Sequence, residues 1–323
     1  MTDVAALVQA VRTGSRRAIG RAITAVETGG ALGRAVLAGV SLHAGGALRI
    51  GITGPPGVGK STLISSLVTS RRAAGQTVAV VSVDPTSPFS NGAVLGDRIR
   101  LVDHFTDPGV FIRSMASRGQ LGGVSLGTAS AMTVLEAAGF DVVIVETVGA
   151  GQNEVEIRSI TDTVVLVLMP GSGDGVQAIK AGVMEIPDVL VINKADHPAA
   201  AVLRTELHAA MRLIPHEGWQ VPVCETRANV GAGIDELWEA VLAHRDALGE
   251  AGVRARRTEG MRSRLRSMAL ARLAVRLDTA CPGPLLDELS SQVVGGERAP
   301  DDAVDRMLAG LLSNDRGGAH PDR

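Results

Sequence analysis

Aromatic residues are almost absent from this chain of 323 residues, which has no tyrosine, four phenylalanines and two tryptophans. Proteins that hold single-stranded nucleic acids stack the bases on aromatic side chains. A formal net charge of −2 also gives no general attraction to a phosphate backbone. We therefore expect no nucleic-acid partner.

Cysteine and long apolar runs are scarce as well. Cys224 and Cys281 lie far apart and match no metal or redox spacing, which favours incidental thiols in a reducing compartment. No run approaches the roughly 20 apolar residues that a membrane-spanning helix needs. The arginine-rich N-terminus carries Asp3 and Glu27 and lacks the apolar core of a signal peptide. We expect folded helices there, a cytoplasmic location and no membrane partner.

Apolar residues, by contrast, make up 45% of the chain, in short runs that alternate with helical patterns. Continuous β-branched runs are typical of strands covered on both faces, so the pattern predicts an α/β fold with a doubly wound, largely parallel sheet. The expected strands are 48–54, 77–84, 110–115, 141–147, 162–170, 188–194 and 221–227. The expected helices in this region are 60–74, 127–139, 175–186, 198–213 and 233–247.

The same patterns divide the chain into three regions. We expect a helical extension over residues 1–46, an α/β domain over 47–248 and a helical arm over 249–323. The arm opens with a basic segment and is broken by Cys-Pro-Gly-Pro at 281–284. We interpret its arginines as a solvated face or a subunit contact.

A glycine-rich stretch follows the first expected strand and opens a helix. Its pattern, Gly54-x-x-x-x-Gly59-Lys60-Ser61, is the Walker A motif in the context that the motif requires. Backbone N–H groups of such a loop surround phosphate oxygens, the lysine reaches the β- and γ-phosphates, and the serine hydroxyl binds Mg²⁺. The alternative, a glycine-rich turn with an incidental lysine, does not explain the spacing. The predicted phosphate-binding residues are Gly54, Pro55, Pro56, Gly57, Val58, Gly59, Lys60, Ser61 and Thr62.

A second motif, Asn193-Lys194-x-Asp196, ends the sixth expected strand and selects the base. An aspartate there accepts hydrogen bonds from N1–H and the 2-amino group of guanine, whereas adenine has no such pair of donors. Asn193 is expected to brace the neighbouring loops, and the stem of Lys194 to lie over the base. The strand that follows ends in Thr226, Arg227 and Ala228, where a backbone amide can meet the guanine carbonyl. The predicted nucleotide is GTP.

Three carboxylates end strands or loops beside this predicted site. Asp84 ends the second expected strand, Asp97 follows a loop rich in proline and glycine, and Glu146 ends the fourth strand. With Ser61 they form a predicted Mg²⁺ site, because Mg²⁺ takes oxygen ligands and keeps several waters. A helix N-cap remains the alternative for Asp97.

A further loop, after the fifth expected strand, carries Asp174, Gln177 and Lys180. Loops at the carboxyl ends of strands are where such a fold binds and senses ligands. The sequence shows no well-placed glutamine for an attacking water and no arginine aimed at the γ-phosphate. We therefore expect slow intrinsic hydrolysis, since an arginine from a partner is worth ~10³–10⁵ in rate.

Taken together, the motifs resemble the MeaB/ArgK family, the GTPase chaperones of adenosylcobalamin-dependent methylmalonyl-CoA mutase, which are related to the human methylmalonic aciduria type A protein. The stretches that carry the resemblance are GITGPPGVGKSTLI, VVSVDPTSPFSNGAVLGDRIRL, FIRSMASRGQLGGVS, DVVIVETVGAGQNEVE and PGSGDGVQAIKAGVMEIPDVLVINKAD. The resemblance implies a P-loop G-domain of the SIMIBI class with a C-terminal helical dimerisation arm.

The resemblance also implies roles for particular residues. Lys60, Asp84, Asp97 and Glu146 match positions important for nucleotide, metal and hydrolysis, and the Gly149 N–H is placed to contact the γ-phosphate. The residues implied to relay the nucleotide state to a partner are Gln152, Asn153, Glu154, Asp174, Gln177 and Lys180. Residues 152–156 are then free to move.

The partner implied by the resemblance is a cobalamin-dependent acyl-CoA mutase, with methylmalonyl-CoA mutase favoured. The GTPase is expected to gate adenosylcobalamin loading and the release of damaged cofactor, and to be stimulated by the mutase. Three alternatives are a nickel-type metallochaperone GTPase, a small-molecule kinase and a purely structural binding module. The first would need a cysteine- or histidine-rich metal relay, but the seven histidines are scattered. The second would need an acceptor pocket and a base, and the third does not explain Lys60-Ser61 beside three carboxylates.

Overall fold

The computed structural model describes residues 3–84, 101, 103–116, 126–147, 152–171, 187–212 and 218–316; for residues 84, 116, 152–155 and 310–316 it describes the backbone alone. The chain forms two compact units, residues 1–262 (unit 1) and residues 263–323 (unit 2). The expected boundary between residues 248 and 249 stays a prediction.

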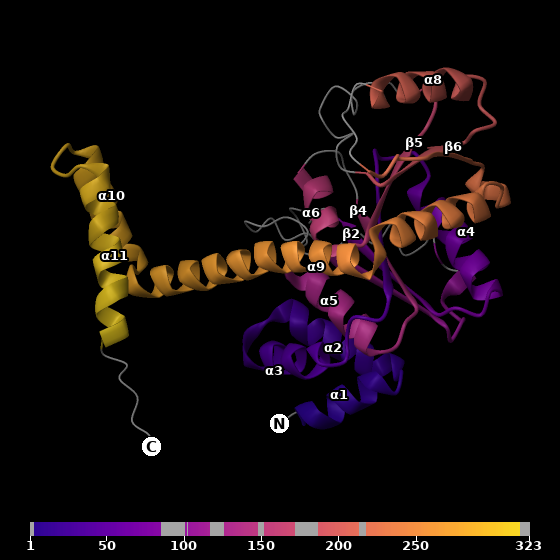
Figure 1. The fold of residues 1–323 in the computed structure, drawn as a ribbon. Coiled ribbons are helices and arrows are strands. Elements are labelled where there is room, and N and C mark those ends of the chain that lie inside the picture. Colours follow the sequence, from indigo (N-terminus) through magenta and orange to yellow (C-terminus); the bar gives the residue numbers. More distant parts are fainter. Residues whose placement is uncertain are drawn as a thin grey trace. The chain divides into compact units, whose positions relative to one another are not determined.

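Unit 1 is built around a sheet of seven parallel strands in the order β3-β2-β4-β1-β5-β6-β7 (Figure 1). The strands are β1 Leu48–Thr53, β2 Val78–Asp84, β3 Val110–Ala116, β4 Val142–Thr147, β5 Thr163–Leu168, β6 Val189–Asn193 and β7 Val223–Thr226. The doubly wound parallel sheet and its seven strands confirm the α/β prediction. The expected strand ends were right to within two residues.

Helices cover both faces of this sheet. They are α1 Val4–Arg12, α2 Arg16–Thr28, α3 Gly30–Ser41, α4 Lys60–Ala73, α5 Leu126–Ala137, α6 Gln152–Ile160, α8 Ala200–Met211 and α9 Ile234–Ala280. Unit 2 holds the end of α9 with α10 Gly283–Val294 and α11 Pro300–Arg316. The helices expected before the α/β domain and those expected near 60–74, 127–139, 198–213 and 233–247 are confirmed. The expected helix 175–186 lies outside the described residues.

The central strand β4 shows why the sheet is buried on both sides. All six of its residues are buried, and alternate side chains point to opposite faces. Val142 and Ile144 share a core with α4 and the first turns of α9. Val143 and Val145 share another core with α5 and the three N-terminal helices. The N-terminal extension therefore completes one face of the sheet.

Helix α9 contains one break, at Gly249, whose φ of 60° and ψ of 177° are not helical. Glycine adopts such a backbone without the steric cost that a Cβ would add. Residues 250–262, called the root segment below, follow the break and belong to unit 1.

Aspartates line the amino edge of the sheet. Asp141, Asp162 and Asp188 each stand directly before a strand and accept a hydrogen bond from a backbone N–H next to the start of the neighbouring strand. The three bonds run from Thr77 N to Asp141 Oδ2 (2.7 Å), from Arg49 N to Asp162 Oδ2 (3.0 Å) and from Val164 N to Asp188 Oδ2 (2.8 Å). Each carboxylate therefore satisfies a backbone donor at the end of a ladder.

Two arginines of the root segment bind two of these aspartates. Arg256 donates to both carboxylate oxygens of Asp188, at 3.0 and 2.7 Å, and Arg257 donates to both of Asp162, at 2.7 and 2.6 Å. The interpretation of the arm's arginines as a solvated face or a subunit contact was wrong for this pair. Bidentate pairing with buried carboxylates explains the difference, because it holds the root segment against the amino edge of the sheet.

Candidate nucleotide site

The phosphate-binding loop lies between the end of β1 and the start of α4. Gly54, Gly57 and Gly59 have positive φ values of 143°, 80° and 95°. A Cβ on Gly54 would overlap the Val167 carbonyl oxygen, and a Cβ on Gly59 would lie 2.5 Å from Asn193 Nδ2. The loop conformation therefore requires glycine at these two positions, both for its backbone angles and for its close packing. Strand, loop and helix follow one another as the Walker A pattern predicts.

Lys60 and Ser61 open α4, and their side chains are buried. Lys60 Nζ donates to the carbonyls of Gly54 at 2.8 Å and Pro55 at 2.9 Å. Ser61 Oγ donates to Glu146 Oε1 at 3.0 Å. The ammonium group is thus placed over the loop, and the hydroxyl is placed beside a carboxylate.

Glu146 reaches this position because β4 lies between β1 and β2. Its Cα pairs with Ile52 on one side and with Ser82 on the other. The carboxylate is 3% exposed, and Ser82 Oγ lies 3.4 Å from its second oxygen, Oε2. A hydroxyl and a carboxylate brought together at the carboxyl edge are the hard oxygen donors that Mg²⁺ prefers, so the described side chains fit the ion. The side chain of Asp84 and all of Asp97 lie outside the described residues.

Asn193 joins three parts of the site. Its Nδ2 donates to the Val58 carbonyl at 2.9 Å. Its Oδ1 accepts from Thr226 Oγ1 at 3.0 Å and from the Ala228 N–H at 3.2 Å. One buried amide at the end of β6 therefore satisfies an acceptor in the phosphate-binding loop and two donors at and just after the end of β7.

Lys194 follows with φ of 57°, a left-handed backbone that non-glycine residues seldom adopt. Its Nζ donates to the Gly57 carbonyl at 3.1 Å and lies 3.2 Å from Met169 Sδ. The strained backbone turns the lysine stem back toward the phosphate-binding loop and lets the chain continue to Asp196. Strain of this kind is typical of binding sites.

A cavity of about 400 Å³ lies beside Asp196. It is lined by Ala195, Asp196, Glu225, Thr226, Arg227, Ala232, Gly233 and Glu236. Three of the predicted base-binding residues are therefore on its wall. The other five lining residues were not predicted from the sequence; they are Ala195, Glu225, Ala232, Gly233 and Glu236. The sequence feature that could have indicated this wall is the glycine-rich turn after Ala228. The turn folds back so that Arg227 and Ala232 form an antiparallel bridge.

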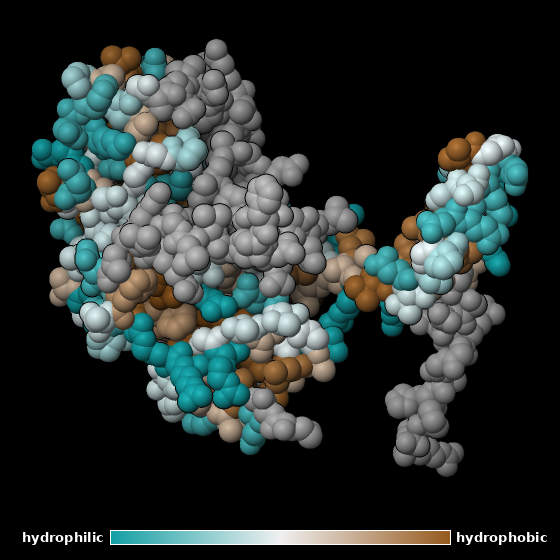
Figure 2. Space-filling model, turned by 180° about the vertical axis from the view of Figure 1, so that it is seen from behind, coloured by the Kyte–Doolittle hydropathy of each residue, from teal (hydrophilic) through white to brown (hydrophobic). Residues whose placement is uncertain are grey.

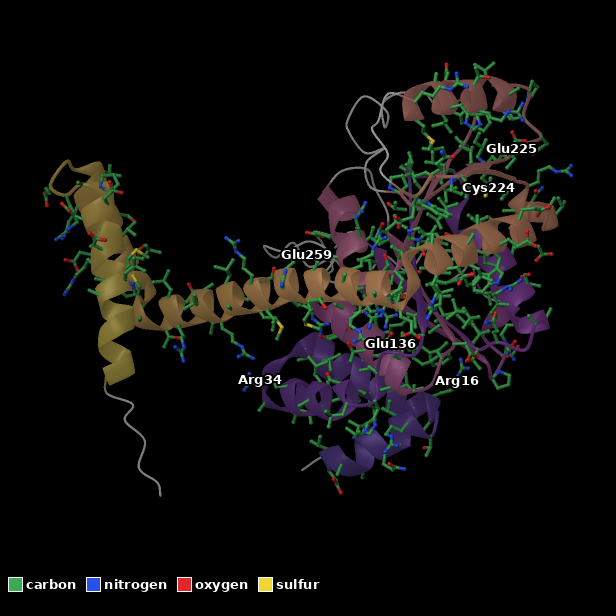
Figure 3. The ribbon with its side chains drawn as sticks, in the orientation of Figure 1. Arg16, Arg34, Glu136, Cys224, Glu225 and Glu259 are labelled. Carbon is green, nitrogen blue, oxygen red and sulfur yellow. The ribbon has the colours of Figure 1, made fainter. Side chains whose placement is uncertain are left out.

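Cys224 stands next to this cavity wall in β7 and is not a reactive group. Burial raises the pKa of its thiol to about 11, and the charge of Glu236 adds to the shift. The thiol is therefore protonated near neutral pH, and it is a poor nucleophile and metal ligand. Figure 3 shows it beside Glu225.

The remaining predicted residues divide into two groups. Gln152, Asn153 and Glu154 form the first turn of α6, and only their backbone is described. Gly149, Asp174, Gln177 and Lys180 lie outside the described residues. Within the described part of the chain, no group of three or more His, Cys, Asp or Glu could hold a metal ion. No helix among the described residues is both long and apolar enough to cross a membrane.

A parallel sheet with a Walker A loop after β1 and an Asn-Lys-x-Asp motif at the end of β6 defines a P-loop GTPase. The family model described as methylmalonyl-CoA mutase-associated GTPase MeaB matches residues 19–281. A putative GTPase of Pyrococcus abyssi is 43% identical over 311 residues, which cover 95% of this chain and 96% of the relative. The chain belongs to the MeaB family.

Two further comparisons agree with this assignment. The GTPase ArgK of Escherichia coli is 38% identical over 254 residues, which cover 76% of this chain and 77% of that protein. The crystal structure of an LAO/AO transport system kinase superposes with a TM-score of 0.70 at 27% identity, over 97% of this chain and 99% of that one. The match to ArgK covers about three quarters of this chain, and the match to the solved structure covers nearly all of it.

Proposed function

We propose that this GTPase binds an adenosylcobalamin-dependent acyl-CoA mutase, with methylmalonyl-CoA mutase favoured, and gates the loading, protection and reactivation of its cofactor. The observation that carries the proposal is the match of residues 19–281 to a family described as mutase-associated. The nucleotide site supports it, because GTP binding and hydrolysis give such a partner two states to recognise. We place this activity in the cytoplasm.

In the proposed reaction, the backbone N–H groups of residues 54–59 bind the phosphates, and Lys60 neutralises charge on the β- and γ-phosphates. Ser61 and Glu146, together with Asp84 and Asp97, would hold Mg²⁺. Bound Mg²⁺ supplies positive charge to the phosphate oxygens. Glu146 also orients water at this edge of the sheet, and Gly149 N–H donates to the γ-phosphate. Asp196 accepts from guanine.

Hydrolysis by the GTPase alone is slow in this proposal, and the mutase accelerates it. Among the described residues, two lysines, Lys60 and Lys194, donate to carbonyls of the phosphate-binding loop, and no hydrogen bond from an arginine to these carbonyls is seen. A partner that supplies or orders a charged group at the γ-phosphate raises the rate by ~10³–10⁵. Residues 152–154, Asp174, Gln177 and Lys180 are proposed to carry this contact.

The proposal is tested by measuring GTP hydrolysis with and without purified methylmalonyl-CoA and isobutyryl-CoA mutases. We expect at least about a tenfold stimulation by one of them, well below the ceiling for a supplied arginine. Pull-down of the mutase by the GTPase with GDP or a non-hydrolysable GTP analogue gives the binding side of the test. If neither mutase binds or stimulates, the chaperone assignment fails although the protein remains a GTPase.

Glu146→Gln separates binding from hydrolysis. Gln keeps the size and a carbonyl acceptor for Ser61 but removes the charge that would hold Mg²⁺ and orient water. We expect GTP affinity within about threefold of wild type and a loss of mutase-stimulated hydrolysis of about 10²-fold. Full stimulated activity of this variant would show that Glu146 has no part in hydrolysis.

A homodimer formed through unit 2 is part of the proposal. Among its described residues, only Cys281, Leu289 and Ala303 are buried apolar residues, which is little core for about 50 residues. Figure 2 shows hydrophobic residues among hydrophilic ones on its surface. The exposed large apolar side chains described in unit 2 are Leu265, Leu270, Leu273, Val275, Leu286, Val294, Val304 and Leu308. Contact with a second copy would cover part of this surface.

Light scattering after gel filtration tests the dimer. We expect a mass near twice 33.3 kDa for the wild type and a monomer for the double variant Leu270→Glu and Leu273→Glu. Both side chains are about half exposed, so the charges are tolerated in a monomer but not in an apolar contact. An unchanged dimer would show that the contact between the copies lies elsewhere.

Nickel binding by the purified protein would instead favour the metallochaperone. Transfer of labelled γ-phosphate to a small molecule would favour the kinase.

A further inference from the structure

Helix α6 packs on the sheet through a glycine. A Cβ on Gly51, in the middle of β1, would lie 2.6 Å from Ile157 Cγ1 and 3.0 Å from Thr161 Oγ1. Ile157 is fully buried. Because Gly51 has no side chain, α6 rests directly on the backbone of β1, three residues before the phosphate-binding loop begins at Gly54.

Near its carboxyl end, α6 meets a second glycine. Gly260, in the root segment of α9, is buried, and a Cβ there would overlap the Ser159 carbonyl oxygen. Figure 1 shows α6 beside α9 and close to β4. Helix α6 is therefore held between the strand that leads into the nucleotide site and the root segment, with glycine at both contacts.

An ion-pair network fixes the root segment next to the end of α6. Asp162 follows α6 by two residues, and both of its oxygens accept from Arg257. Arg257 also donates to the Ala47 carbonyl at 2.9 Å and lies 3.8 Å from Glu136, the partner of Arg49. Figure 3 shows Glu136 at this junction. A shift of the root segment is therefore coupled to the segments before β1 and β5.

The other end of α6 lies on the nucleotide side. The helix begins at Gln152, five residues after Thr147 ends β4. Glu146, the residue before Thr147, accepts a hydrogen bond from Ser61 at the start of α4. One short helix therefore links the carboxyl edge of the sheet to the root segment. Close packing transmits small shifts: the fully buried Ile157 side chain lies directly on the backbone of Gly51, and the Ser159 carbonyl lies directly on the backbone of Gly260.

We propose that α6 couples the nucleotide state of the site to the position of the root segment. The difference between bound GDP and bound GTP shifts α6, and α6 shifts residues 250–262. Coupling between two sites is reciprocal, so a change at the root segment alters the relative affinities for GTP and GDP. This inference rests on nucleotide binding and does not require the mutase.

Gly260→Ala tests the coupling. Alanine is favourable in a helix, but its Cβ must push the root segment and α6 apart. We expect the ratio of the dissociation constants of a non-hydrolysable GTP analogue and GDP to change by about fivefold or more, the lower end of measured allosteric couplings. A purely structural role would weaken both nucleotides equally and leave the ratio unchanged.

Gly20→Ala in α2 is the matched control, since it makes the same substitution in a helix where a Cβ meets nothing within 4 Å. Thr258→Ala is the control within the root segment, because that side chain is exposed. Both controls should keep the wild-type ratio. A ratio for folded Gly260→Ala within about twofold of wild type would overturn the proposal, since ordinary couplings exceed that value.

Hydrogen exchange of the wild-type protein decides the case if Gly260→Ala does not fold. Peptides from residues 250–262 should exchange at different rates with GDP and with the GTP analogue, although they lie at the opposite edge of the sheet from the phosphates. Equal exchange in the two nucleotide states would overturn the proposal.

Discussion

The two edges of the sheet use charged residues in opposite ways. At the amino edge, Asp162 and Asp188 are paired with arginines and with backbone N–H groups of neighbouring strands. At the carboxyl edge, Lys60 and Lys194 donate to backbone carbonyls of the phosphate-binding loop. At the amino edge, aspartates and arginines of the chain neutralise one another. At the carboxyl edge, two lysine ammonium groups lie against the loop that is predicted to bind phosphate.

The difference between the two edges indicates whether a substitution should change the stability of the fold or the binding and hydrolysis of the nucleotide. A charge that is neutralised by a buried partner contributes to the stability of the fold, because its removal leaves the partner buried without a counter-charge. A cation that donates to the carbonyls of the phosphate-binding loop lies where a bound phosphate would meet it, and its removal affects binding and catalysis. We therefore expect substitutions at the carboxyl edge to change activity or affinity, and substitutions at the amino edge to change stability.

The largest expected effect is at the carboxyl edge. Lys60→Ala removes the cation over the phosphate-binding loop, and hydrolysis should fall about 10³-fold, equivalent to about 4 kcal/mol of transition-state stabilisation. Single-turnover hydrolysis of GTP with and without the mutase measures it. Arg262→Ala is the control, because that side chain is 74% exposed. Activity of Lys60→Ala near the wild-type level would end the assignment of Lys60 to phosphate binding.

At the amino edge, Arg256→Ala leaves Asp188 buried without its bidentate partner. The free energy of unfolding should fall by about 3 kcal/mol, the lower end of the cost of breaking a buried pair. Chemical denaturation of the variant measures this loss. The exposed neighbour Arg254 supplies the control, since Arg254→Ala should change stability by no more than about 0.5 kcal/mol. Equal stabilities of the two variants would show that the pairing contributes nothing.

A third prediction changes specificity at the carboxyl edge. Asp196→Asn exchanges an acceptor for a donor, so the pairing with the 2-amino group of guanine is lost and a carbonyl at that position is accepted instead. We expect GDP affinity to fall by about 30-fold, or about 2 kcal/mol, and xanthosine diphosphate to bind more tightly than GDP. Titration with labelled nucleotides measures both. If the variant still binds GDP more tightly than xanthosine diphosphate, Asp196 does not recognise the base.

The smallest effect concerns pH at the amino edge. His244 lies 3.3 Å from Asp188 and 2.9 Å from Thr163, with Arg158, Arg256 and Asp162 nearby. Burial lowers the pKa of His244 below its ordinary value near 6.5, and the two arginines lower it further while the aspartates oppose them. The folded chain therefore favours the neutral imidazole, and the unfolded chain binds the proton first as pH falls.

The stabilisation from neutral His244 is thus present above pH 6.5 and is lost as pH falls toward the lower folded pKa. Between pH 7.5 and 5.5, we expect the wild-type melting temperature to fall by about 2 °C more than that of His244→Gln. Differential scanning fluorimetry in matched buffers measures the difference. A variant with the wild-type pH dependence would show that another group titrates in this range.

The sequence predicted the seven strands and the Walker A loop because these signals are local. A continuous apolar run or a glycine spacing is read from neighbouring residues. Helix α6 was missed and its first residues were expected to be free to move. Its nine residues are mostly polar, and its packing partners, Gly51 and Gly260, lie about 100 residues away in either direction. No local pattern reveals such a contact.

The arginine pairs were misread for the same reason. Arg256 and Asp188 are 68 residues apart in the chain, and Arg257 and Asp162 are 95 apart. A basic run on a helix is typical of a solvated face, and only the fold shows which carboxylates it meets. In the base pocket, the motif residue Asp196 was identifiable, whereas Glu225 and Glu236 line the wall through the folding-back of the turn after Ala228.

The near-absence of aromatic residues has a practical consequence for optical measurements. Both tryptophans lie in unit 1, Trp219 against His244 with ring centroids 5.1 Å apart and Trp238 under Arg71 at 4.3 Å. With no tyrosine in the chain, intrinsic fluorescence reports on unit 1 alone. Unfolding of unit 2 should be silent in fluorescence and visible in circular dichroism, so a difference between the two melting curves measures the independence of the units.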